Sequence, residues 1–187
     1  METSFKFFIV RHPFERLTSV FEDKFATQHR RSLATKQFSE IHHHIIEKYR
    51  TNKENKSLYP TFLEFVEYLL NEAPRNRTIE AWNKYPAWSP YYTKCRPCSV
   101  SYDAIFDLKS LEKEQKYLFH RVPELSFLSN LKNWEHKSPR SNNDRNQAYF
   151  SQLTMEQIYK LYKLYDVDFK MFSYNYIDFL KYAKDAP

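Results

Sequence analysis

The sequence predicts a single α/β domain that is rich in helices and contains few strands. Its length of 187 residues suits one domain. Two short segments, 6–11 and 99–106, have the apolar pattern of strands, and several longer segments carry apolar side chains at helical spacing. Aromatic residues make up 18% of the chain and would supply much of a packed core.

The first 26 residues predict a strand, a tight turn and a helix. Residues 6–11 (KFFIVR) form a compact apolar run that is typical of a buried strand. His12-Pro13 ends this run, and proline suits the first position of a helix. The apolar residues that follow at helical spacing are Phe14, Leu17, Phe21 and Phe25.

The next segment, up to residue 98, predicts two helices separated and followed by loops. A helix is expected around 37–49 within a polar, basic stretch, followed by a loop to about residue 59. Thr61 and Glu64 form a capping box that opens a second helix. Residues 71–98 contain four prolines and two tryptophans, which indicates a packed, irregular loop rather than a linker.

The remaining elements follow from the same patterns. In chain order they are a strand at 99–106, a helix at 110–120, a polar and mobile stretch at 132–147, a helix opened by the capping box Thr154–Gln157, an aromatic tail at 167–176 and a short helix at 177–183.

Composition limits the classes of function. The net charge of +6 favours an anionic partner, although a merely basic surface would give the same number. The chain contains no glycine, which excludes a glycine-rich phosphate loop. No run of 18 apolar residues is present, so a membrane anchor is expected only in a longer form of the protein.

The two cysteines, Cys95 and Cys98, form a Cys-x-x-Cys pair. A structural zinc site needs two further ligands, and the nearest cluster, His42 to His44, lies about fifty residues upstream. We therefore expect no metal, and interpret the histidines as a solvated helix face. A disulfide and two reduced thiols both remain open. Sequons at Asn55 and Asn76 slightly favour a secretory compartment.

Arg11 and Ser19 are the candidate site residues. The predicted strand delivers Arg11 to the start of a helix, whose free amides and dipole attract anions. A guanidinium is a forked donor that suits a phosphate dianion. Ser19 lies within the first two helical turns and would add a hydroxyl. An ordinary strand-turn-helix with Arg11 in a surface ion pair explains these residues equally well.

The same segment resembles the 3′-phosphate-binding motif of the sulfotransferases, which use 3′-phosphoadenosine-5′-phosphosulfate as donor. The sequence Arg-His-Pro-Phe-Glu-Arg-Leu-x-Ser, from Arg11 to Ser19, is similar to that of the Golgi carbohydrate sulfotransferases, including the chondroitin and dermatan 4-O-sulfotransferases. Further blocks resemble this family in the same order: Tyr59-Pro60-Thr61-Phe62-x-Glu64-Phe65, Trp88 with Cys95-x-x-Cys98 and Tyr102-Asp103-x-Ile105, Tyr149-Phe150-Ser151-Gln152-Leu153-Thr154, and Tyr165-x-x-Asp168-Phe169-x-x-Phe172-x-Tyr174.

The resemblance implies a partial P-loop-like sulfotransferase fold, helix-rich with few parallel strands. It implies that Arg11 and Ser19 hold the 3′-phosphate of the donor, and that a basic stretch comprising Lys137, Ser138, Arg140 and Ser141 approaches the nucleotide. It further implies a sugar hydroxyl of a chondroitin- or dermatan-like glycan as acceptor, the Golgi lumen as location and a disulfide between the cysteines. It identifies no catalytic base, and His12 is expected to position the turn.

The chain departs from the family pattern at its start. The family has an upstream strand-loop-helix that holds the 5′-phosphosulfate, whereas only five residues precede residue 6 here. We therefore expect residues 1–187 to form one sulfotransferase domain that lacks this element and transfers no sulfate alone. An inactive module that binds nucleotide or anionic glycan is the alternative. A nucleic-acid-binding domain is disfavoured, because no such motif occurs and the aromatic residues have core spacing.

Overall fold

The computed structural model describes residues 4–26, 36–74, 78–83, 87–130 and 142–187. These residues form, in chain order, β1 (Phe7–Val10), α1 (Pro13–Lys24), α2 (Lys36–Tyr49), α3 (Phe62–Glu72), α4 (Ile79–Trp82), α5 (Tyr91–Lys94), β2 (Ala104–Asp107), α6 (Leu111–Arg121), the 3₁₀-helix η1 (Pro123–Asn130), α7 (Asn142–Phe150), α8 (Met155–Met171) and α9 (Ile177–Leu180).

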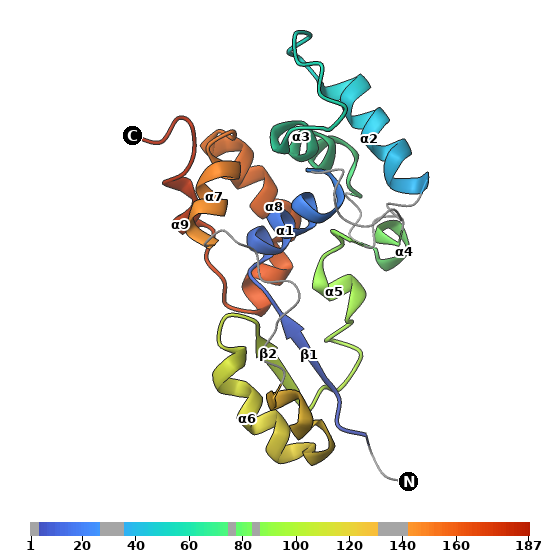
Figure 1. Ribbon diagram of the computed structural model, residues 1–187, viewed down its shortest axis with the longest axis vertical. Helices are drawn as coiled ribbons and strands as arrows, with labels where there is room; N and C mark the ends of the chain where they lie inside the picture. Colours follow the sequence, from blue (N-terminus) through green and yellow to red (C-terminus); the bar gives the residue numbers. More distant parts are fainter. Residues whose placement is uncertain (1–3, 27–35, 75–77, 84–86, 131–141) are drawn as a thin grey trace.

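The strands β1 and β2 form a parallel pair, in which Phe7 lies opposite Ala104 and Val10 lies opposite Asp107 (Figure 1). The prediction of a helix-rich α/β protein with few parallel strands is therefore confirmed at this level. Because the strands are parallel, their carboxyl ends meet at one edge of the sheet. This edge carries Arg11, which directly follows β1, and Asp107, the last residue of β2.

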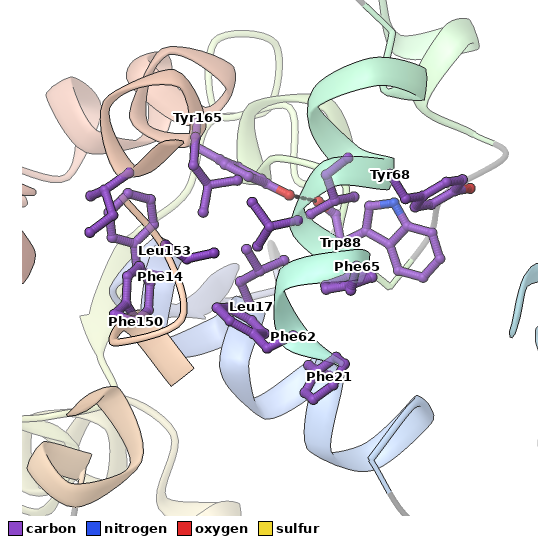
Figure 2. Close-up of a cluster of buried hydrophobic side chains, with 14 of the residues drawn as sticks. Phe14, Leu17, Phe21, Phe62, Phe65, Tyr68, Trp88, Phe150, Leu153 and Tyr165 are labelled. Carbon is purple, nitrogen blue, oxygen red and sulfur yellow. Dashed lines mark hydrogen bonds between the residues drawn. The ribbon is translucent and has the colours of Figure 1, made fainter. Parts of the chain in front are cut away.

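The main hydrophobic core lies between α1, α3 and α8 and consists largely of aromatic rings (Figure 2). Phe14 of α1 lies 5.1 Å from Phe150, measured between ring centroids, and Phe21 lies 5.3 Å from Phe62 of α3. The hydroxyl of the fully buried Tyr165 donates to the carbonyl oxygen of Trp88 at 2.8 Å, so its polar end is satisfied. The predicted helical spacing of the apolar residues in α1 and α3 is confirmed.

In Figure 1, α6 lies beside the strand pair and below α1, α3 and α8. A smaller hydrophobic cluster joins α6 to the strands. Its buried residues are Phe106, Leu111 and Leu118, and Phe5 and Phe7 pack against it. No helix in the described part of the chain combines the length and apolar character needed to cross a membrane.

The structure corrects two boundaries. The strand predicted at 99–106 is shorter and begins at Ala104. Residues 99–103 precede the strand, and the Asp103 amide donates to the Lys6 carbonyl oxygen at 2.7 Å. Residues 142–147, predicted to belong to a polar and mobile stretch, lie in α7. This helix is held against α1, where Nε of Arg145 lies 3.1 Å from the Glu22 carboxylate. The spacing of apolar residues within one segment cannot predict an ion pair between residues that are distant in the chain.

α8 extends to Met171, further than the apolar stripe predicts, and ends in a tight left-handed turn. Ser173 has φ of 56°, and the Tyr174 amide donates to the Phe169 carbonyl at 2.9 Å. This is the Schellman arrangement, in which glycine usually takes the left-handed position. The turn brings the Tyr174 hydroxyl to Asp107 at the edge of the sheet, where it donates at 2.9 Å.

Candidate functional site

Arg11 lies where the sequence predicts, between the carboxyl end of β1 and the first turn of α1. Its side chain is 18% exposed, and its Nε lies 3.4 Å from the carboxylate of Glu15, one helical turn further on. Its backbone N–H donates to the Tyr91 hydroxyl at 3.1 Å. The ion pair that the sequence offered as an ordinary explanation of Arg11 is therefore present, whereas the binding of a phosphate by Arg11 stays a prediction.

Ser19 lies on the same face of α1 as Glu15, because residues four apart in a helix are neighbours. The order along this face is thus Arg11, Glu15 and Ser19, with Ser19 partly exposed. The neighbouring Thr18 is buried, and its hydroxyl donates to the Glu15 carbonyl at 3.0 Å. The Ser19 side chain, unlike that of Thr18, is therefore partly accessible from solvent.

His12 caps α1, as predicted for a residue that positions the turn. Its Nδ1 accepts from the Phe14 amide at 3.2 Å, and its Nε2 lies 3.0 Å from the Asn175 carbonyl oxygen. These partners place the ring proton on Nε2. Burial lowers the pKa of His12 and outweighs the opposing effect of the Asn175 carbonyl. With both ring nitrogens engaged, His12 has a structural role and is not placed to act as a base.

This cap corrects one part of the predicted phosphate site. The sequence interpretation relied on free amides in the first turn of α1. Proline 13 has no N–H, however, and the Phe14 amide already donates to His12. Those two positions offer no donor to an anion, so a phosphate at this edge would depend more on side chains than the sequence interpretation assumed.

Tyrosine hydroxyls surround the same edge of the sheet. Tyr174 lies 5.1 Å from His12, measured between ring centroids, and burial, followed by the hydrogen bond to Asp107, raises the pKa of its hydroxyl. Burial also raises the pKa of Tyr91, whose hydroxyl accepts from Arg11. Both hydroxyls therefore stay protonated at neutral pH and add no negative charge to an edge that already carries Asp107 and Glu15.

A second cation, Arg16, joins α1 to α5 and α8. Its guanidinium carbon lies 4.3 Å from the centroid of the Tyr91 ring, and its Nη2 donates to the Ser89 carbonyl. The fully buried Asp168 accepts from the amides of Tyr91 and Tyr92 at 2.6 and 3.0 Å. Burial raises the pKa of this carboxyl, against the effect of the two amides and Arg16.

Sequence reasoning assigned no role to this arrangement. A signal was present, because Asp168 lies on the apolar stripe of α8, three residues after Tyr165 and seven after Leu161. A carboxylate on a buried stripe requires donors. The pattern does not indicate that these donors lie 77 and 76 residues away, in α5.

The structure describes both residues of the Cys-x-x-Cys pair. Cys95 and Cys98 are both free, the first half-buried and the second exposed, so the disulfide implied by the resemblance is not formed here. Between them Arg96 takes a left-handed φ of 48°. Among the described residues, no group of three or more His, Cys, Asp or Glu side chains is placed to hold a metal ion.

The interpretation of His42 to His44 as a solvated face is correct for the exposed His43 and His44 but wrong for His42. The ring of His42 lies 4.9 Å from that of Phe25, and its Nε2 lies 2.7 Å from the Lys24 carbonyl oxygen at the end of α1. The predicted nucleotide-approaching residues Lys137, Ser138, Arg140 and Ser141 lie outside the described residues.

Comparison with known proteins gives consistent matches. The chain matches the sulfotransferase family over residues 1–175. It is 29% identical to carbohydrate sulfotransferase 11 of Rattus norvegicus over 185 residues, which cover 97% of this chain and 50% of the relative. It is 34% identical to carbohydrate sulfotransferase 10 of Gallus gallus over 180 residues, covering 94% of this chain and 48% of the relative.

Carbohydrate sulfotransferase 10 of Homo sapiens is 33% identical over 184 residues, covering 96% of this chain and 49% of the relative. The chain thus spans about half the length of the curated relatives it matches. No solved structure matches it. Because the family match includes the segment from Arg11 to Ser19 and most of the rest of the sequence, the chain belongs to the sulfotransferase family.

Proposed function

We propose that this protein serves in the transfer of a sulfuryl group from 3′-phosphoadenosine-5′-phosphosulfate to a sugar hydroxyl. The acceptor would be a glycosaminoglycan-type glycan of the chondroitin or dermatan kind, and the reaction would take place in the Golgi lumen. Family membership and relatives named carbohydrate sulfotransferases support the reaction class. We infer that the described elements belong to a partial P-loop-like sulfotransferase fold.

The observation that carries the proposal is the place of Arg11. Ligands of open α/β sheets bind beyond the carboxyl ends of the strands, and Arg11 stands there on one helix face with Ser19. Arginine presents several N–H donors in a planar fork, so a phosphate can bind while Nε keeps its contact with Glu15. Arg11 and Ser19 would therefore hold the 3′-phosphate of the donor.

In the proposed reaction, the sugar hydroxyl oxygen forms a bond to sulfur while the bond from sulfur to the bridging phosphate oxygen breaks. The hydroxyl proton passes to a base, and 3′,5′-adenosine diphosphate leaves with the electron pair of the broken bond. Arg11 and Ser19 would act on the other phosphate of the same nucleotide. Their contribution is binding and orientation of the donor rather than bond breaking.

A pair of nucleotides tests this assignment, because 3′,5′-adenosine diphosphate and 5′-adenosine monophosphate differ by the 3′-phosphate. In calorimetric titrations, Arg11→Ala should weaken binding of the diphosphate by about 1.5–3 kcal/mol, the value of a charge-assisted contact. Binding of the monophosphate should change little. Ser19→Ala should weaken diphosphate binding by about 1 kcal/mol.

Arg121→Ala is the matched control, because Arg121 is exposed at the end of α6 and its loss changes the net charge by the same amount. It should leave both affinities unchanged. If Arg11→Ala and Arg121→Ala weaken diphosphate binding equally, the effect is one of overall charge and the site assignment is wrong.

A further inference from the structure

A pocket of about 270 Å³ lies away from Arg11, at the end of α1 and the start of α3. Phe21 and Phe62, which lie close together in Figure 2, line it together with Tyr59 and Tyr149. Phe21 follows Arg11 by ten residues, which corresponds to roughly 15 Å along a helix. It follows Ser19 by only two residues, but at about 100° per residue these two side chains point to opposite sides of α1. The pocket and the proposed phosphate site are therefore separate, and both can be filled at once.

Arg50 holds the wall of this pocket in place. It comes from the end of α2, is nearly buried, and forms two hydrogen bonds with the carboxylate of Glu64, at 3.0 and 3.2 Å. The same guanidinium donates to the carbonyl oxygens of Asn55 at 3.2 Å and Tyr59 at 2.8 Å, and also to that of Ser57. A loop fixed by three carbonyl contacts to one cation is pre-organised, so a ligand need not order it.

Within the loop, short-range hydrogen bonds add to this order. The Ser57 amide donates to Oδ1 of Asn55 at 3.0 Å, and the Tyr59 amide donates to the Ser57 hydroxyl at 3.1 Å. On the opposite side, the Tyr149 hydroxyl donates to the Glu22 carboxylate at 3.2 Å, which fixes the second tyrosine. Both aromatic walls of the pocket are therefore anchored.

The chemistry of the lining selects a class of ligand. Besides aromatic rings it presents hydroxyl and amide groups, from Ser57, Thr61, Asn55 and Gln152, and no charged side chain is among the described residues that line it. Such a surface offers no compensation for a sulfate, phosphate or carboxylate that loses its water. The pocket is wide open to solvent and its volume is just below the range of drug-sized sites, so it would cover one face of a single ring rather than enclose a nucleotide.

We propose that this pocket binds a neutral sugar residue, such as an N-acetylhexosamine, of the glycan that the protein acts on. Tyrosine rings offer an apolar surface to the C–H face of a pyranose. The side-chain oxygens of Asn55, Gln152 and Thr61 already accept bonds within the protein, and their N–H and O–H groups can donate to the hydroxyls of a sugar. The role as a glycan subsite rests on the proposed function. The binding of a neutral sugar rests on the pocket alone.

Saturation-transfer NMR on the whole chain tests the proposal, with methyl N-acetyl-β-galactosaminide as the neutral probe and methyl β-glucuronide as the anionic one. Protein made in bacteria keeps Asn55, which begins a sequon, unmodified. The neutral probe should receive saturation from the protein and the glucuronide much less. Tyr59→Leu, which keeps the carbonyl bound by Arg50, should lower the neutral signal at least fivefold.

Leu58→Ala is the matched control, because Leu58 is 76% exposed on the same loop and does not line the pocket. It should leave the signal unchanged. Asn55→Asp provides a second variant that keeps the oxygen bound by the Ser57 amide, and it should also lower the neutral signal. Absence of saturation in wild-type protein, equal signals from both probes, or full signals in both pocket variants would overturn the proposal.

The outcome is separable from that of the donor site. Tyr59→Leu should leave the calorimetric affinity for 3′,5′-adenosine diphosphate unchanged, and Arg11→Ala should leave the sugar signal unchanged. Loss of the nucleotide result alone would contradict the proposed function while leaving the pocket intact. Loss of the sugar result alone would contradict only the pocket.

Discussion

Arg11 shares its guanidinium with a carboxylate one turn along α1, and this pairing affects how it can bind an anion. Glu15 lies 3.4 Å from Nε of Arg11, and both side chains are about one fifth exposed, at 20% and 18%. A phosphate bound by Arg11 and Ser19 would therefore lie beside a negative charge. Solvent screens part of this repulsion, because neither side chain is fully buried.

Glu15→Gln should accordingly strengthen binding of 3′,5′-adenosine diphosphate, by about threefold after allowance for screening. The amide keeps the shape of the side chain and removes its charge. Calorimetric titration measures the change, with the exposed Glu156→Gln of α8 as the control that alters the net charge equally. Weaker binding in Glu15→Gln would instead show that the carboxylate orients Arg11 for the ligand.

His12 links the stability of α1 to pH. Burial lowers its pKa in the folded protein, so the unfolded chain, with a histidine pKa of about 6.5, takes up a proton first as the pH falls. The contribution of His12 to the free energy of unfolding is therefore fully present above about pH 6.5 and declines as the pH drops below that value. A protonated Nδ1 would also lose its contact with the Phe14 amide.

His12→Asn should flatten part of this decline, because asparagine can cap a helix and does not titrate. Urea unfolding at about pH 7 and pH 5 measures the slope. His42, whose pKa is also lowered by burial, should account for some of the remaining slope. The exposed His43→Asn is the control and should keep the wild-type slope. An unchanged slope in His12→Asn would rule out the proposed linkage.

At the scale of single elements, the capping boxes illustrate what local sequence determines. Thr154 and Gln157 form the predicted reciprocal pair at the start of α8. The backbone N–H of Gln157 donates to the Thr154 hydroxyl at 3.1 Å, and the backbone N–H of Thr154 donates to Oε1 of Gln157 at 2.8 Å. The same pairing of Thr61 and Glu64 opens α3. All the residues involved are three apart, so the sequence pattern is sufficient to predict them.

Thr154→Ala should therefore lower the free energy of unfolding by about 1 kcal/mol, the usual cost of losing an N-cap hydroxyl. Chemical denaturation measures the change against Thr51→Ala, an exposed threonine outside the helices. That control should stay within about 0.5 kcal/mol of wild type. Equal stability of Thr154→Ala and wild type would mean that α8 is held by packing alone.

Local features of the site and fold could be predicted from the sequence, whereas contacts between distant segments could not. The strand, turn and helix around Arg11 follow from a short apolar run, a proline and helical spacing, all of which are local. α7 was missed because its sequence is polar and its attachment depends on the pair of Arg145 with Glu22, far apart in the chain. The cap formed by His12 and the contacts of Asp168 likewise depend on tertiary packing, which no spacing rule encodes.

At the scale of the whole molecule, apolar burial is divided unequally. The main core joins α1, α3 and α8, whereas α6 and the strand pair share a small cluster of Phe106, Leu111 and Leu118 (Figure 1). Fewer buried apolar contacts hold the smaller part in place. It should therefore open at a lower free energy than the main core.

Native-state hydrogen exchange should show this difference. The backbone amides of α6 should exchange at least tenfold faster than those of α3 and α8 under conditions where the whole protein stays folded. The helical amides of α3 provide an internal control, because α3 and α6 have the same length of 11 residues. Equal protection across the three helices would indicate a single cooperative unit.

The left-handed turn after α8 has a wider consequence for a chain without glycine. Ser173 and Arg96 adopt positive φ angles although each carries a Cβ atom, and such conformations cost about 1–2 kcal/mol each. The same absence of glycine restricts every other position of the denatured polypeptide, which then has fewer backbone states to give up when it folds. Local steric strain at two positions thus accompanies a stiffer denatured ensemble along the whole sequence.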